Sequence, residues 1–461
     1  EPYLAAGLVY VYAGCRGRSN GYDSTGGSSK DGFFSGGAPW GVTDLKAAVR
    51  YLRYNRAVLP GDTGRVFVFG HAAGGGLAAI MGCSGNSALY DPYLAKIGAA
   101  THDAEGTAVT DEVAGAMCWC PQVSPGTSDA AYEWGVGQFS DEGSRADGTW
   151  TRLLSNDLAA SYASQVNALG LRDEQGAALT LDQTEGGIFT DGTYYERMVT
   201  LVQGSIEEFL RQASFPYTEQ AVDEAAGDFP GSGVSAASVP AATTGQAADP
   251  VTYDTLEDYV AALNADGHWV TYNSRRGTVR IAGISSFVRR YRKATKDVPA
   301  FDAIARNAPA NQLFGNDEND SLHFSQDVAD QLSAHADTYS QAQGWDDGAA
   351  QGWTDDLAKT DSLDQPMDVR RNMYDPLYYL SGSQAGFGTA TVAAHWRINS
   401  GMFRTDTPVT SDANLALALK GYDGVQDVSY TPVWGAGRVR AELSGDATTA
   451  FVTWVASRFQ Q

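Results

Sequence analysis

The stretch RVFVFGHAAGGG, from Arg65 to Gly76, decides the fold of this chain. Its first half, Arg65–Phe69, is strand-like and contains the apolar run Val66–Phe69, and the pattern G-H-A-A-G follows directly. Small residues in that pattern are typical of a sharp strand-to-helix turn, where two backbones approach closely. In enzymes such a turn lifts a serine hydroxyl above the sheet. Here the central residue is Ala72, so the turn is predicted without its hydroxyl group.

Segments on both sides of this turn indicate an α/β protein with a mostly parallel, doubly wound sheet. Gly41–Asn55 has apolar residues at helical spacing, and Leu77–Met81 continues the chain as a helix of small residues. Ala114–Cys118 is typical of the next buried strand. The order helix, strand, turn, helix, strand is the one that a doubly wound sheet requires.

A succession of short blocks resembles the bacterial tannases, which are esterases of the α/β-hydrolase superfamily that cleave galloyl esters. The blocks keep the family's order along the chain, and they are GCRGR (Gly14–Arg18), DLKAAVRYLRYN (Asp44–Asn55), FGHAAGGG (Phe69–Gly76), GNSALYDPYL (Gly85–Leu94), AYEW (Ala131–Trp134), NQLFG (Asn311–Gly315), HWRI (His395–Ile398), NLALAL (Asn414–Leu419) and VWGAG (Val433–Gly437). The resemblance implies an α/β-hydrolase fold with a large inserted lid domain. It places the core in residues 1–122 and 367–461, and the lid in residues 123–366.

The resemblance also places the family's catalytic triad on this sequence. Its serine falls on Ala72, and its histidine, which follows the WGxG block, falls on Arg438. Its acid lies in a stretch resembling GxxDxDT, which here reads GMFRTDT, so the acid falls on Arg404 or on Asp406. No histidine lies beyond His395 in the sequence.

These substitutions remove the proton transfer on which a serine esterase depends. The base must accept the hydroxyl proton near neutral pH, and a carboxylate must orient that base. A guanidinium stays protonated in proteins, so Arg438 cannot accept a proton. We therefore predict that Ala72, Arg404 or Asp406, and Arg438 do not support acyl transfer.

Two functions from different classes follow from the resemblance. The first is a pseudoenzyme that serves as a binding or structural subunit, in a hetero-oligomer or a filament. The second is a carboxylic ester hydrolase for galloyl or other aromatic esters, in which Ala72 replaces the nucleophile.

Other polar residues near the triad positions are candidates for ligand contacts. His71 lies inside the turn and either contacts a ligand or packs locally. Asp406 either accepts a hydrogen bond from a ligand or pairs with Arg404 or Arg438. Glu442 follows Arg438 by four residues, so the two would pair if that segment were helical.

Composition excludes several function classes. The net charge of −23 argues against nucleic acid as a partner, since phosphates are bound by clusters of Lys and Arg. No apolar run is long enough to span a membrane, and we expect a soluble protein, with a secreted or cell-surface location favoured over the cytoplasm. No cofactor is implied. The acidic stretch Asn316–Asp320 lacks the spacing of a calcium loop, so no metal site is predicted. The four cysteines are expected to be buried thiols, with a bridge between Cys83 and Cys15 or Cys118 as the alternative.

The start of the chain and its content of Tyr and Trp suggest two partners. Gly7–Gly14 resembles the family's second or third core strand, and the family's earlier strands have no counterpart. A partner chain or an N-terminal segment is therefore expected to cover an open sheet edge. The 23 Tyr and 10 Trp residues suit a small aromatic ligand under a lid.

The remaining patterns predict local elements, most of them in the proposed lid. The expected elements are helices over Ser155–Leu169, Tyr194–Gln212, Thr255–Ala265 and the basic stretch Phe287–Thr295, a hairpin over Trp269–Ile281, and loops over Ser19–Ala38 and Ala225–Pro250.

Overall fold

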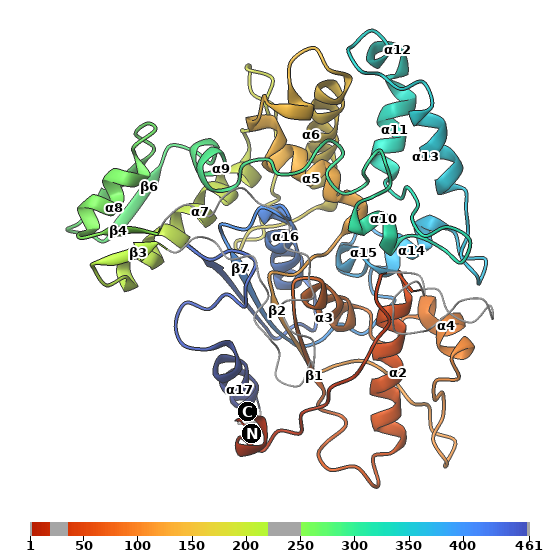
Figure 1. Cartoon of the computed structure of the whole chain (residues 1–461). Helices are drawn as coiled ribbons and strands as arrows, with labels where there is room; N and C mark the ends of the chain where they lie inside the picture. The colour runs from red at the N-terminus through yellow and green to blue at the C-terminus, as the bar shows by residue number, and fades with distance from the viewer. Residues whose placement is uncertain (1, 19–35, 220–249, 459–461) are drawn as a thin grey trace.

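A four-stranded parallel sheet forms the centre of the molecule, with the strand order β1-β2-β7-β8 (Figure 1). The computed structural model describes residues 2–18, 36–219 and 250–458. The sheet strands are β1 (Phe67–His71), β2 (Gly115–Trp119), β7 (His395–Gly401) and β8 (Asp427–Val433). All three strand pairs are parallel, with Phe67 opposite Gly115, Gly115 opposite His395 and His395 opposite Asp427. The expected parallel sheet is therefore confirmed.

Both faces of the sheet are buried, as strand β2 shows. Successive residues of a strand point to opposite faces. Ala116 and Cys118 belong to the large core that α2 (Trp40–Tyr54) and α3 (Ala73–Cys83) share, whereas Met117 and Trp119 pack against α17 (Ala447–Arg458) on the other face. Figure 1 shows α17 on one side of the sheet and α2 and α3 on the other. Burial on both faces explains why this strand is apolar at every position.

The other elements surround this sheet. The helices are α1 (Pro2–Ala5), α4 (Asp91–Lys96), α5 (Ser128–Gly135), α6 (Trp150–Leu169), α7 (Thr193–Gln212), α8 (Leu256–Leu263), α9 (Ser285–Tyr291), α10 (Pro309–Leu313), α11 (Gln326–Ala334), α12 (Ala336–Tyr339), α13 (Ala349–Leu357), α14 (Met367–Met373), α15 (Pro376–Leu380) and α16 (Val409–Lys420). Short 3-10 helices are η2 (Ala88–Tyr90), η3 (Pro125–Thr127), η4 (Gly137–Phe139) and η5 (Gly143–Arg145). Two antiparallel pairs lie apart from the sheet, β3 (Tyr217–Glu219) with β4 (Val251–Tyr253) and β5 (Val270–Asn273) with β6 (Thr278–Ile281). None of the described helices combines the length and the apolar character that crossing a membrane requires.

Most of the expected elements form within a few residues of their predicted ends. The helix expected over Gly41–Asn55 is α2, and the hairpin expected over Trp269–Ile281 is β5 with β6. The basic helix expected over Phe287–Thr295 is shorter, because α9 ends at Tyr291. The expected loops Ser19–Ala38 and Ala225–Pro250 lie almost wholly outside the described residues.

The strand expected over Gly7–Gly14 is wrong, because the structure has no strand between residues 8 and 18. Side chains hold this segment in place: the Tyr10 ring stacks on the Tyr3 ring with centroids 4.7 Å apart. Leu8 and Tyr10 join the smaller core that Phe69 and α17 line. Apolar residues such as Leu8 and Tyr10 therefore pack on the protein from an extended coil, as they would from a strand.

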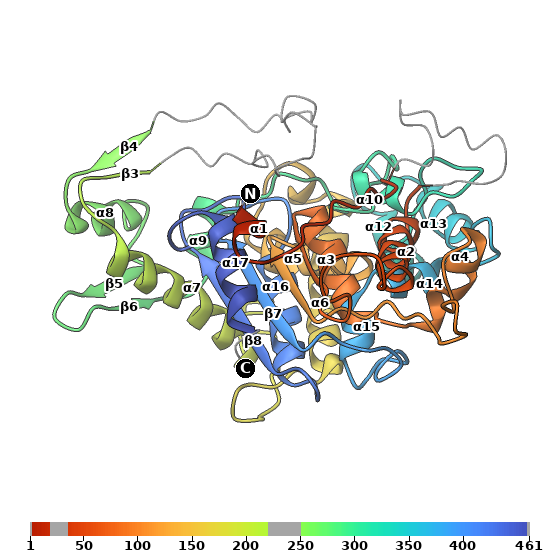
Figure 2. The ribbon, with the colours of Figure 1, turned by 90° about the horizontal axis from the view of Figure 1, so that it is seen from below.

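The four strands of the sheet come from residues before 122 and after 394, and the segment 123–366 supplies none of them. Figure 2 shows the helices of that segment, from α5 to α13, on both sides of the sheet strands. The division into a core of 1–122 and 367–461 and a lid of 123–366 stays a prediction.

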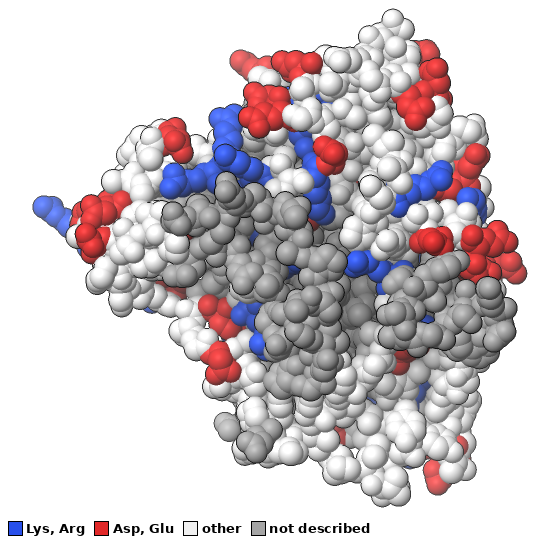
Figure 3. Space-filling model, viewed as in Figure 1, with Lys and Arg blue, Asp and Glu red and all other residues white. Residues whose placement is uncertain are grey.

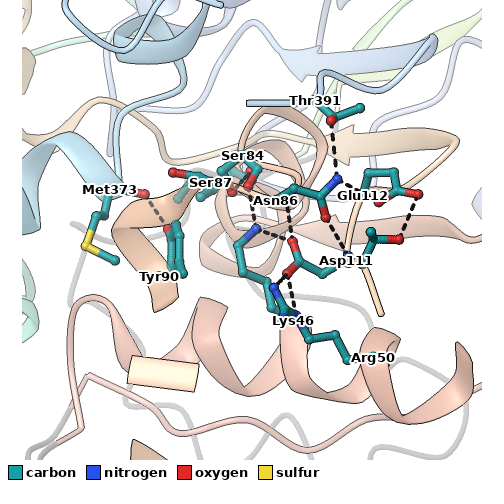
Figure 4. Close-up of polar contacts among 12 residues, drawn as sticks. Lys46, Arg50, Ser84, Asn86, Ser87, Tyr90, Asp111, Glu112, Met373 and Thr391 are labelled. Carbon is teal, nitrogen blue, oxygen red and sulfur yellow. Dashed lines mark hydrogen bonds and ion pairs between the residues drawn. The ribbon is translucent and has the colours of Figure 1, made fainter. Parts of the chain in front are cut away.

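A buried ion cluster fastens α2 to the segment that leads into β2 (Figure 4). Lys46 and Arg50, one helical turn apart on α2, lie 2.8 and 2.7 Å from the two carboxylate oxygens of Asp111. Lys46 also donates to the carbonyl oxygen of Ser84. Asn86 and Asp111 exchange two hydrogen bonds between backbone and side chain. Burial alone would raise the pKa of Asp111, but Lys46 and its other partners outweigh burial and hold that pKa below its usual value.

We expect Asp111→Asn to lower the free energy of unfolding by about 3 to 5 kcal/mol, because it leaves the buried Lys46 ammonium without a counter-charge. Urea denaturation measures this loss. The matched control is Glu112→Gln, because Glu112 is a third exposed and pairs with Arg53 at 3.0 Å. It should cost about 1 kcal/mol or less. Equal costs at the two positions would contradict a special role for Asp111.

The same substitution should change the acid limb of the stability profile. A carboxyl group whose folded pKa is lowered stabilises the fold above its unfolded pKa, about 3.9 for Asp, and loses this contribution as pH falls through the folded pKa. The chain with Asp111→Asn should therefore lose less stability below about pH 4 than the unchanged chain.

Candidate functional site

The turn between β1 and α3 keeps a rare backbone conformation around a residue without a functional group. Ala72 has φ +52° and ψ −118°, outside the regions that most residues adopt. A sharp, strained strand-to-helix turn of this kind is where α/β-hydrolases hold their nucleophile. The glycines beside it are sterically required: a Cβ atom on Gly70 would lie 2.0 Å from the Gly74 oxygen, and one on Gly76 would lie 2.1 Å from the Gln122 oxygen. The turn therefore presents a methyl group where a hydroxyl group would belong.

His71, the residue before Ala72, is buried and faces the segment after β8. Its Nε2 atom lies 3.1 Å from the carbonyl oxygen of Arg438. Since a carbonyl oxygen only accepts hydrogen bonds, Nε2 carries the proton and donates it. Burial lowers the pKa of His71 to about 4, and the nearby guanidinium groups of Arg438, Arg440 and Arg404 add to this effect. The imidazole is neutral at pH 7.

Asp406 lies between Arg404 and Arg438, the two arginines at predicted triad positions. Its carboxylate is 4.0 Å from the Arg404 Nε atom and 3.7 Å from the Arg438 Nη1 atom. Gln122 donates a hydrogen bond of 2.9 Å from its side chain to Oδ2. Burial would raise the pKa of Asp406, but Arg404 and Arg438 outweigh it and lower that pKa, so the group is ionised. Among the described residues no group donates a hydrogen bond to Oδ1, which is buried.

Arg404 is fully buried and belongs to a second ion pair below the first. Its Nη2 atom lies 3.2 Å from the Asp412 carboxylate, which α16 supplies, and 3.4 Å from the carbonyl oxygen of Pro121. Ser400 also donates a hydrogen bond to Asp412. Burial opposes the charge on Arg404, but Asp412 and its other partners raise the pKa of this guanidinium above its usual value. Arg404 is thus permanently cationic, and its pairing with Asp412 holds the guanidinium in the protein interior.

A second buried guanidinium, Arg292, holds the backbone of this loop. It donates hydrogen bonds to the carbonyl oxygens of Met402 and Thr407. Burial, and then the charge of Arg404, lower the pKa of Arg292 to about 10. The loop that carries Arg404 and Asp406 is therefore fixed at both of its ends.

An apolar cavity lies beside Arg292, and it is lined by other residues than the predicted triad positions. Its lining includes Trp134, Met198, Phe287 and Val409. Ala72, Asp406 and Arg438 do not line it. The cavity and the residues of the turn are thus separate features.

The structure brings all of the predicted site residues together, namely His71, Ala72, Arg404, Asp406 and Arg438. Gln122 links the turn to Asp406, because its backbone N–H donates to the Ala72 oxygen at 3.2 Å while its side chain holds the carboxylate. Whether any of these residues binds a ligand stays a prediction.

Three residues of the network were not predicted from the sequence to belong to the site, namely Gln122, Arg292 and Asp412. Gln122 could have been suspected, because it follows the carboxyl end of a strand that lies beside β1. Arg292 follows α9, more than a hundred residues before the site loop, and Asp412 lies in the first turn of α16, just after that loop. No local pattern marks either residue as part of the site.

Two smaller expectations are corrected. Glu442 does not pair with Arg438, because residues 438–442 form no helix; it pairs with Arg397 at 2.6 Å and accepts a hydrogen bond from Trp119. The cysteines Cys15, Cys83, Cys118 and Cys120 are all free, so neither alternative bridge forms, and Cys15 is exposed. No group of three His, Cys, Asp or Glu residues within the described ranges could hold a metal ion.

Comparisons with known proteins agree with this architecture. A family model described as BD-FAE matches residues 35–114. A comparison with curated protein sequences finds no match. Among solved structures, a tannin acyl hydrolase from Lactobacillus plantarum is 22% identical, with a TM-score of 0.63, and the match covers 93% of this chain and 73% of that chain.

Two further structures give the same result. A Fusobacterium nucleatum tannase is 23% identical with a TM-score of 0.65, covering 96% of this chain and 76% of that chain. A tannin acyl hydrolase in complex with ethyl gallate is 22% identical with a TM-score of 0.62, covering 93% and 73%. Together with the parallel sheet and the strand-to-helix turn, these matches show that the chain has the α/β-hydrolase fold of the tannase structures.

Proposed function

We propose that this chain has lost the ester hydrolysis for which the similar structures are named, and that it acts as a binding or structural subunit. The observation that carries the proposal is Ala72, at the position that presents the nucleophile in this fold. A methyl group cannot attack a carbonyl carbon. The site around it supports the same conclusion for each of the other two triad roles.

No suitable general base faces Ala72 among the described residues. The guanidinium of Arg438 stays protonated and cannot accept a proton. His71 is the imidazole beside the turn, and its Nε2–H bond is directed to the Arg438 carbonyl oxygen. With a pKa of about 4, His71 is a weak base at neutral pH.

The acid position has acquired a structural role instead. A carboxylate should orient the base and stabilise its positive charge. Arg404 carries the opposite charge and is buried against Asp412. Asp406, the other candidate, is shared by the two guanidinium groups of Arg404 and Arg438. The site therefore holds a network of ion pairs where an esterase needs a proton relay.

We expect Ala72→Ser alone to restore no useful esterase activity, because a serine without a base gains no nucleophilicity. Its hydrolysis of ethyl gallate should stay within about 10⁴ times the uncatalysed rate, because binding and an oxyanion hole alone supply residual catalysis of that size. Release of gallate from purified protein measures this rate.

The matched control is Ala72→Gly, which tolerates the positive φ and adds no hydroxyl group. Activity shared by the serine and glycine variants reports a contaminating esterase. Hydrolysis by the serine variant alone at more than about 10⁵ times the uncatalysed rate would overturn the proposal. It would support the alternative, an ester hydrolase whose nucleophile is replaced by Ala72.

A structural role for Arg404 makes a second prediction. Arg404→Met should lower the free energy of unfolding by about 3 to 5 kcal/mol, because it leaves the buried Asp412 carboxylate uncompensated. Arg438→Met is the matched control, since Arg438 is partly exposed, and it should cost about 1 kcal/mol or less. Urea denaturation compares the two variants. An unchanged free energy of unfolding in Arg404→Met would show that the Arg404–Asp412 ion pair does not stabilise the site.

A small phenolic ligand is the binding partner that the site favours. The buried Oδ1 atom of Asp406 has no hydrogen-bond donor among the described residues, and a phenolic hydroxyl group would supply one. One of the similar structures is a tannin acyl hydrolase in complex with 3,4-dihydroxybenzoate. His71 and Asp406 are the residues that we expect such a ligand to contact.

We expect 3,4-dihydroxybenzoate to raise the melting temperature of this chain. A ligand at ten times its Kd adds about 1.4 kcal/mol to the free energy of unfolding. Asp406→Asn should abolish the shift, and benzoate, which lacks the hydroxyl groups, should produce less of it. Thermal scans of each variant against its own ligand-free form test this, and an unchanged melting temperature over the whole titration would exclude the ligand.

A further inference from the structure

The hairpin β5–β6 and helix α9 carry a concentration of positive charge that the rest of this acidic chain lacks. Residues 270–293, here called the basic arm, contain seven Lys and Arg residues and no Asp or Glu, whereas the whole chain has a net charge of −23. Figure 3 shows Lys and Arg side chains gathered over the position of α9. The arm is therefore a local reversal of the protein's charge.

Five of these cations are available to a partner, namely Arg275, Arg276, Arg280, Arg289 and Lys293. All five are exposed, and none forms an ion pair or a side-chain hydrogen bond with any residue in the described ranges. The other two differ: Arg290 lies 3.5 Å from Asp266, and Arg292 is buried under the site loop. The exposed cations belong to the hairpin turn, to β6, and to α9 and the residues after it.

A complementary surface lies elsewhere on the same chain. Residues 317–368, here called the acidic lobe, include α11, α12 and α13 and contain thirteen Asp and Glu residues with one cation, Lys359. Ten of the acidic residues are exposed, and these are Asp317, Glu318, Asp320, Asp330, Asp337, Asp346, Asp347, Asp355, Asp364 and Asp368. The lobe thus offers a dense anionic surface to anything that approaches it.

The two surfaces lie on opposite sides of the molecule. Figures 1 and 2 show β6 and α9 at one side and α12 and α13 at the other. No ion pair joins the basic arm to the acidic lobe among the described residues. A copy whose arm is occupied by a neighbour would still present its own lobe, so contacts between copies would run head to tail.

We propose that the basic arm of one copy docks on the acidic lobe of a second copy of this chain. Charge complementarity selects this occupant, because surfaces of opposite charge attract each other over about a Debye length and orient the two copies as they meet. A long polyanion such as nucleic acid fits less well, because beyond the arm it would run along the acidic remainder of the chain. The proposal does not depend on the loss of catalysis.

Sedimentation velocity of the full chain over a range of concentrations tests this association. At about 25 mM NaCl, where the Debye length is about 20 Å, the sedimentation coefficient should rise with protein concentration. At about 500 mM NaCl, where screening shortens that length to about 4 Å, the protein should sediment as a monomer. A monomer at low salt over the whole concentration range would overturn the proposal.

Paired charge reversals show which surfaces are responsible. The arm variant carries Arg275→Glu, Arg276→Glu and Arg280→Glu, and the lobe variant carries Asp330→Lys, Asp337→Lys and Asp355→Lys. Each variant alone should associate less than the unchanged chain at low salt. An equal mixture should associate again, because the unchanged arm of the lobe variant can then dock on the unchanged lobe of the arm variant. Unchanged melting temperatures show that both variants fold.

Two outcomes would contradict the assignment. Self-association of either variant at the wild-type strength would place the contact elsewhere. If the unchanged chain stays monomeric at low salt and instead binds added polyglutamate through the arm, the occupant is a foreign acidic polypeptide.

Discussion

The backbones of β1, α3 and the segment after β2 meet at distances that leave no room for side chains. Gly70, Gly75 and Gly76 are the residues that permit this approach, since a Cβ atom on any of them would lie within 2.8 Å of a backbone oxygen. The contact sets the angle at which α3 leaves the sheet and brings Gln122 beside the turn. The turn at Ala72 and the residue Gln122 are positioned by this junction, which depends on small residues and on no side-chain functional group.

Ion pairs dominate the polar contacts around the loop that carries Arg404 and Asp406. Arg404 and Asp412 lie below the site and Arg438 at its rim, with Asp406 shared between the two arginines. Each charge has an opposite charge close by, so burial is tolerable. A buried ion pair is costly to break from one side, so loss of either Arg404 or Asp412 alone would destabilise this part of the fold.

The sequence predicts the fold where a local pattern has one structural solution. The glycines around Ala72 and the apolar run of β2 are such patterns, and both elements form as expected. The stretch Gly7–Gly14 was misjudged because it was matched to a core strand of the family by resemblance, and its apolar side chains do not reveal whether a hydrogen-bonding neighbour is present. Arg292 and Asp412 could not be found, since their roles arise only when α9 and α16 are packed against the site loop.

The sheet is assembled from strands that are far apart in the sequence. Strand β7 begins at His395, while β2, its neighbour, ends at Trp119. A ribosome adding roughly 5 to 20 residues per second needs about 15 to 55 seconds to cross that interval. During this time one edge of β2 waits without its partner, exposed to aggregation. Such a delay makes the nascent chain a natural client for chaperones and makes its folding yield sensitive to the speed of translation.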